Sequence, residues 1–94
     1  MELSERCIQI LEKEGFPFVY ETQDAPGAIY EEHAHEGKVA LFVTEGAFEI
    51  TFLGLTKSLT SGERVDIPKE TPYSALVGSQ GCQLVVGEMV DGDF

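Results

Sequence analysis

The chain has few positively charged residues. Its 94 residues include 6 Lys and Arg against 17 Asp and Glu, so its formal net charge is −11 at pH 7. Such a surface repels the phosphates of nucleic acids and the headgroups of anionic lipids. We therefore expect neither a nucleic acid nor a membrane as a partner.

Asparagine is absent, and cysteine is scarce. Without asparagine there is no site for N-glycosylation. The only cysteines, Cys7 and Cys82, lie far apart in the sequence. This usage is typical of free thiols in the core of an intracellular protein, with a single disulfide as the alternative.

Apolar runs long enough to span a bilayer are missing, as are several motifs of common enzyme classes. The sequence contains no GxGxxG, GxxxxGK[ST], GxSxG or CxxC pattern. It therefore gives no sign of a dinucleotide site, a phosphate-binding loop, a hydrolase nucleophile or a dithiol centre. The first residues form a charged amphipathic segment rather than a signal peptide, so we expect a cytoplasmic protein.

The period of the hydrophobic pattern changes near Gly15. Before this glycine, apolar residues recur at helical spacing: Leu3, Cys7, Ile8 and Leu11. This pattern predicts a helix within residues 4–14 of an N-terminal segment 1–15. We expect Ser4 to cap it and Gly15 to end it.

From residue 16 to 90 the period is two, and turn signals follow one another closely. We expect about eight short antiparallel strands, near 16–21, 28–35, 38–45, 47–54, 56–60, 63–67, 72–77 and 82–89. Many short strands at regular spacing are typical of all-β sandwiches and closed barrels. The sequence predicts one all-β domain over residues 1–94, with a tail at 91–94. A barrel with fewer strands, of the SH3 or OB type, is the alternative.

His33 and His35 are the only histidines, and one residue separates them. Residues i and i+2 of a β-strand share a face, so both imidazoles could converge on one metal ion. Glu31 has the same parity, and it would line the same cavity as a possible third ligand. The alternative is a solvated, charged strand end with Glu31 as a surface carboxylate.

The strand that follows has two apolar faces. If the histidines face the barrel interior, Val39 and Leu41 face it too, and Ala40 and Phe42 lie on the outside. Apolar residues on an outer face need cover, either from the N-terminal helix or from a second copy of the chain. On this ground we expect a homodimer.

Two spaced motifs resemble those of the cupin family. The first family motif places a glycine five residues before an HxH pair and ends on another glycine, as Gly27 and Gly46 do around the histidines here. The second begins with a glycine followed by a proline, matched by Gly62 and Pro68. The resemblance covers residues 15 to 89 and implies a cupin-type antiparallel β-barrel, the jelly roll or double-stranded β-helix.

The expected metal site is incomplete. Metal-binding cupins typically ligate through both HxH histidines, a glutamate and a second-motif histidine; Val39 and Tyr73 stand at the last two positions, and Glu70 replaces a glycine. Tyr73 is either a costly phenolate ligand or a hydrogen-bonding group that lines the cavity. The resemblance therefore implies a divalent metal ion (Zn, Fe, Ni, Mn or Cu) held weakly by His33 and His35.

Two functions remain open. The first is a cupin that binds a divalent metal weakly, a small molecule in the barrel cavity, or both; Glu31, Val39, Leu41 and Tyr73 would line that cavity. The second is a metal-free, non-catalytic cupin that serves as a ligand-binding or protein-interaction module. A fold match alone does not decide between them.

Overall fold

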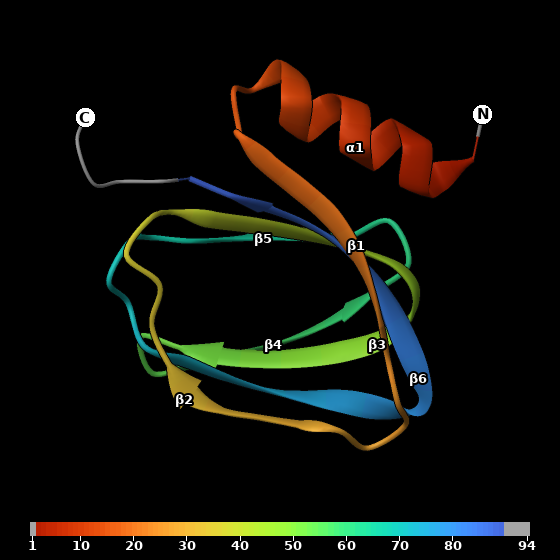
Figure 1. Cartoon of the computed structure of the whole chain (residues 1–94). Helices are drawn as coiled ribbons and strands as arrows, with labels where there is room; N and C mark the ends of the chain where they lie inside the picture. The colour runs from red at the N-terminus through yellow and green to blue at the C-terminus, as the bar shows by residue number, and fades with distance from the viewer. Residues whose placement is uncertain (1, 90–94) are drawn as a thin grey trace.

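The computed structural model describes residues 2–89 and consists of one helix followed by β-strands (Figure 1). The elements are α1 (Leu3–Lys13), β1 (Phe18–Asp24), β2 (Ile29–His33), β3 (Val39–Phe52), β4 (Leu55–Thr60), β5 (Arg64–Ile67) and β6 (Tyr73–Glu88). All strand pairs are antiparallel. The predicted all-β barrel behind a short helix is confirmed. The predicted tail at 91–94 lies outside the described residues.

Two long strands build both walls of the barrel. β3 and β6 pair with each other along most of their length. The first half of β3 and the last part of β6 also pair with β5 and β1, whereas their other halves pair with β4 and β2. The two walls therefore come from the same pair of strands, which bends halfway.

These bends correct the predicted number of strands. We expected turns at Glu45–Gly46 and in 78–81, but the chain continues through both as strand, so six strands replace the predicted eight in residues 2–89. The register of β3 against β6 shifts on both sides of Gly46. Gly46 and Gly81 both have φ of +81°, and a Cβ at Gly46 would clash with the carbonyl oxygen of Gly81. Glycine here lets two strands bend while they remain paired.

Helix α1 ends as the sequence predicts but begins differently. Gly15, at φ +95°, donates its N–H to the Glu12 carbonyl at 3.0 Å, and Phe16 donates to the Leu11 carbonyl at 3.2 Å. This pair of bonds is a Schellman motif. The N-cap is Glu2, not Ser4, which lies inside the helix. Glu2 and Glu5 form a capping box, in which the Glu5 carboxylate accepts a hydrogen bond from the Glu2 N–H at 3.4 Å.

Two apolar clusters hold the fold together. One fills the barrel and includes Val39, Leu41 and Val43. The other lies between α1 and the outer face of the sheet, where Ala40 and Phe42 pack against the helix. The helix therefore supplies the cover that these outward-facing residues need. Among residues 2–89, no helix is long and apolar enough to cross a membrane.

Candidate functional site

A β-bulge positions His33 at the open end of the barrel. Tyr30 pairs with Ala75 and His33 pairs with Tyr73, so β2 contains one more residue than β6 between these pairs. Tyr30 and His33 can therefore share a face although three positions separate them. β2 ends at His33, and it ends close to the end of β3 in Figure 1. We refer to this end of the barrel as the mouth.

His35 lies beyond the strand rather than within it, unlike the predicted strand 28–35. Its carbonyl accepts a hydrogen bond from the Glu70 N–H at 2.7 Å. Glu70 has φ of +58°, which is the conformation that glycine favours and that the second cupin motif assigns to a glycine. This contact holds the loop that carries His35 against the chain just before Tyr73.

Three rings gather at the mouth, and we call His33, His35 and Tyr73 the ring cluster. The ring centroids of the two histidines are 5.3 Å apart. The Tyr73 centroid lies 4.6 Å from that of His33 and 5.8 Å from that of His35. His33 is exposed, His35 is half-buried and Tyr73 is buried, so the cluster extends from solvent into the barrel.

Hydrogen bonds orient both imidazoles. Nδ1 of His33 lies 2.7 Å from the Glu31 carbonyl oxygen, so this nitrogen donates and Nε2 keeps the lone pair. Nε2 of His35 lies 3.0 Å from the Tyr73 hydroxyl. If the phenol donates, Nδ1 of His35 carries the proton of the neutral ring; if the phenol accepts, Nδ1 has the lone pair.

A small cavity of about 60 Å³ lies inside the barrel below the ring cluster. Its polar lining comprises Tyr20, Thr22, Tyr30, His35, Tyr73 and Glu88. Its apolar lining comprises Val39, Leu41, Phe48, Leu84 and Val86. The structure thus brings three of the four predicted cavity residues, Val39, Leu41 and Tyr73, to one cavity together with His35.

The fourth predicted cavity residue, Glu31, is exposed and does not line the cavity. Glu31 would share a face with both histidines only if residues 31–35 formed a regular strand. The bulge in β2 inserts an extra residue, so Tyr30 takes an inward position instead and packs edge-on against Phe48 at 5.6 Å. His33 also lies outside the cavity lining, at the rim.

The sequence analysis missed Tyr20 and Glu88, two polar residues on neighbouring strands of the cavity wall. The Tyr20 hydroxyl donates a hydrogen bond to Glu88 Oε2. Strand parity could have found the glutamate: from Cys82 onward, every second residue of β6 faces the barrel, and Glu88 continues that series.

The environment raises the pKa of all three tyrosines in the chain. Loss of solvent around the hydroxyl is the main cause for Tyr20, Tyr30 and Tyr73, although the Tyr20 side chain as a whole is 42% exposed. The hydrogen bond and the charge of Glu88 raise the pKa of Tyr20 further, and the charge of Glu88 also raises that of Tyr73. Tyr73 is thus held as a neutral phenol, which argues against its predicted alternative role as a phenolate ligand.

The fit of a metal ion to the ring cluster is partial. Two imidazoles that share one ion, each with a nitrogen about 2.1 Å from it, have centroids roughly 5 Å apart, close to the separation found here. The bond from Nδ1 of His33 to a carbonyl is also common among metal-bound histidines. Among residues 2–89, however, no three His, Cys, Asp or Glu side chains lie together where they could hold a metal. When the Tyr73 phenol accepts from Nε2 of His35, the cluster offers two nitrogen ligands, Nε2 of His33 and Nδ1 of His35, and no complete metal centre.

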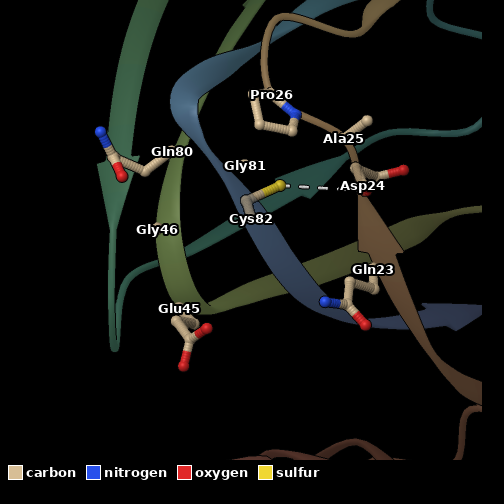
Figure 2. A pocket seen from close by; sticks show the side chains of 9 residues that line it. All are labelled: Gln23, Asp24, Ala25, Pro26, Glu45, Gly46, Gln80, Gly81 and Cys82. Carbon is tan, nitrogen blue, oxygen red and sulfur yellow. Dashed lines mark hydrogen bonds between the residues drawn. The ribbon is translucent and has the colours of Figure 1, made fainter.

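A second hollow, of about 610 Å³, lies at the end of the barrel opposite the mouth (Figure 2). Asp24 and Cys82 pair at this end of β1 and β6, whereas Phe18 and Glu88 pair at the other. Both cysteines are free thiols, so the disulfide alternative is wrong. Burial raises the pKa of the Cys82 thiol to about 11, and Asp24, 3.8 Å from the sulfur, adds to the shift. Cys82 is therefore a protonated core thiol rather than a nucleophile.

Comparison with known proteins identifies the fold. No protein-family model matches the sequence, and no curated protein does. Solved structures do match. KdgF from Halomonas sp. is 22% identical, with a TM-score of 0.67, over 80% of this chain and 70% of that protein. An RmlC-like cupin from Shewanella frigidimarina is 25% identical, with a TM-score of 0.69, over 82% of this chain and 69% of that one.

A larger enzyme contains the same barrel. Oxalate decarboxylase from Bacillus subtilis, which has Mn(II) centres, is 22% identical with a TM-score of 0.71; the match covers 81% of this chain but 21% of the enzyme. These similarities confirm the resemblance suggested by the sequence motifs. The chain has the fold of a small cupin domain, with the ring cluster at the mouth of its barrel.

Proposed function

We propose that this cupin binds a small molecule at the mouth of its barrel. The observation that carries the proposal is the convergence of three aromatic rings on a cavity lined by hydroxyls, one imidazole and one carboxylate. Ligand sites are typically concave and apolar, with a few convergent polar groups.

Saturation-transfer NMR of a mixture of small cationic, neutral and anionic molecules tests this proposal. We expect at least one to bind the wild type and to lose binding in the double variant His33→Ala/His35→Ala, which removes two of the three rings. Glu49→Gln, an exposed position on β3, is the control and should bind as the wild type does. Equal binding to the double variant, with its circular dichroism unchanged, would refute the mouth as the site.

A second candidate function is weak binding of a divalent metal ion (Zn, Fe, Ni, Mn or Cu) by His33 and His35. The separation of the two rings and the carbonyl bond of His33 support it. A bound ion would supply a Lewis acid with open positions for water or a small ligand. With two protein ligands the affinity should be low. The neighbour with Mn(II) centres makes this chemistry plausible for the fold.

Calorimetric titration of chelator-treated protein with Zn²⁺ tests the metal candidate. We expect one ion per chain, bound weakly enough for dialysis against a chelator to remove it. His33→Ala/His35→Ala should not bind it. Undiminished uptake by that variant would mean that other residues hold the ion.

A further inference from the structure

Among residues 2–89, Glu88 is the only side chain with a formal charge in the cavity lining. It is the last residue of β6, directly opposite Phe18 of β1 and beside Val39 of β3. Tyr20 donates a hydrogen bond to its Oε2 atom. No hydrogen bond from another described residue reaches Oε1. A carboxylate in a half-buried place is costly unless it is compensated, and here one of its two oxygens is left for a ligand.

In the part of the chain that the structure describes, no lysine or arginine lines this cavity. Lys38 precedes Val39 in β3, but its ammonium group pairs with Asp66 at 3.7 Å and lies above the ring of Phe16. Arg64 bonds Glu14 and Asp66 at 2.7 and 2.8 Å. These cations are therefore engaged with the outer face of the sheet and α1, and an anionic head group in the cavity would meet Glu88 without a counter-charge.

The other groups near the mouth favour a cation. Tyr20 and Tyr73 present aromatic rings, whose faces attract positive charge. The net charge of −11 also raises the local concentration of small cations around the molecule. The aromatic rings and the net charge therefore favour a cation at the mouth, as the Glu88 carboxylate does.

We propose that the mouth of the barrel selects small organic cations, with a primary ammonium head group held by Glu88 and the aromatic rings. This inference rests on the proposed binding of a small molecule at the mouth. The ammonium donates to Oε1 of Glu88 and leaves the Tyr20 bond to Oε2 in place.

The size of the cavity limits how far the ligand enters. A space of about 60 Å³ admits a head group and excludes an aromatic or aliphatic body. That body would remain outside, against Phe18. This residue is 54% exposed, and its side chain lies on the same face as Glu88 because the two are paired across β1 and β6. The ligand class is therefore an amine with a compact apolar body.

Three matched ligands test this class: benzylamine, benzyl alcohol and benzoate. They share the ring and differ in the charge of the head group. Calorimetry uses chelator-treated protein at pH 8, so that no metal takes part. We expect benzylamine to bind about tenfold more tightly than benzyl alcohol, the equivalent of one charge-assisted contact, and benzoate to bind most weakly.

Glu88→Gln isolates the charge, because glutamine keeps the shape and an acceptor oxygen for Tyr20. In this variant the preference for the amine over the alcohol should disappear, whereas Glu49→Gln should retain it. If benzyl alcohol or benzoate binds the wild type as tightly as the amine, the ligand class is wrong although the mouth is still a binding site. If the amine preference persists in Glu88→Gln, the assignment of Glu88 is wrong. If none of the three binds although another molecule of the NMR mixture does, the ligand class is wrong and the proposed function stands; if the mixture contains no binder either, the proposed function fails as well.

Discussion

The three tyrosines of the chain line one cavity, and their hydroxyls hold its polar groups together. The chain has no tryptophan, and its three tyrosines all line the same cavity. Their hydroxyls bond a carboxylate or an imidazole: Tyr20 to Glu88, Tyr30 to Asp24 at 2.8 Å and Tyr73 to His35 at 3.0 Å. Tyrosine absorbance and fluorescence therefore report on this cavity alone.

The tyrosines should ionise only at unusually high pH. Each has a pKa raised above its usual value near 10, mainly by burial. Raised pKa values in the folded state mean that their contribution to stability is complete below about pH 10. It is lost as the pH rises through the folded values, because the unfolded chain releases its protons first.

A spectrophotometric titration of tyrosinate measures this effect. We expect no tyrosine to ionise near pH 10 while circular dichroism shows intact strands. In denaturant all three should ionise near the usual value. Ionisation of one tyrosine near pH 10 in the folded protein would show that its hydroxyl is not buried as described.

Leu53 has a backbone conformation that is unfavourable for leucine. It is 71% exposed and has φ of +54° in the two-residue turn between β3 and β4, where Gly54 follows with φ of +77°. Two positive φ values define a type I′ turn, for which Asn-Gly is the favoured pair. Leu53→Asn should therefore raise the free energy of unfolding by about 1 kcal/mol.

Urea unfolding checks this prediction. Leu55→Asn is the control, because Leu55 is also exposed, at 64%, but begins β4 rather than forming the turn. It should give no gain. A gain of equal size in both variants would trace the effect to the removal of an exposed leucine, not to the turn.

At the scale of elements, the bend of β3 against β6 makes the barrel. The close approach of Gly46 to the Gly81 backbone leaves no room for a side chain, and the Cβ would also lie 2.9 Å from Cα of Cys82. Gly27 has a similar φ of +72° but nothing within 4 Å of a Cβ. A side chain at either glycine would therefore be strained by the positive φ, but only at Gly46 would it also clash with neighbouring backbone atoms.

Gly46→Ala should cost roughly 2–5 kcal/mol of unfolding free energy, the sum of a positive-φ penalty and overpacking. Gly27→Ala should cost about 1–2 kcal/mol, from the positive φ alone. Denaturant unfolding of the two variants separates the contributions. Equal losses would mean that β3 and β6 do not approach each other so closely.

The sequence predicts an element well when local interactions determine it, and poorly when the pairing of distant strands does. The change of period at Gly15 predicts the helix and its end, because capping and amphipathic spacing are local. The bends at Gly46 and Gly81 were predicted as turns, because a glycine with positive φ looks the same in a turn and in a bulge; only the pairing of distant strands separates them. The bulge in β2 after Tyr30 likewise depends on pairing with β6, and it moves Glu31 from the predicted cavity face to the exposed face.

At the scale of the whole molecule, the helix changes the argument for assembly. The homodimer predicted from the sequence stays a prediction, but its original basis is gone because α1 covers Ala40 and Phe42. Elsewhere, Ile29 of β2, 73% exposed, pairs with Leu76 of β6, 44% exposed, and the two form an exposed apolar pair. This pair is the place where a second copy could bind.

Sedimentation equilibrium at micromolar concentration decides the state. If the predicted dimer forms through this pair, Ile29→Lys should dissociate it, because each interface would then bury a charge. Ile10→Lys, on the exposed side of α1, should leave it intact. A wild-type monomer would contradict the prediction, and a dimer insensitive to Ile29→Lys would move the interface elsewhere.

The mouth of the barrel, and not another hollow, is the proposed binding site. Backbone amide NMR of the chelator-treated protein titrated with benzylamine tests it most directly. We predict shifts concentrated at residues 33–39, 73 and 86–88, with little change near Asp24 and Cys82. Shifts confined to the hollow of Figure 2 or to α1, with the mouth unchanged, would contradict the account.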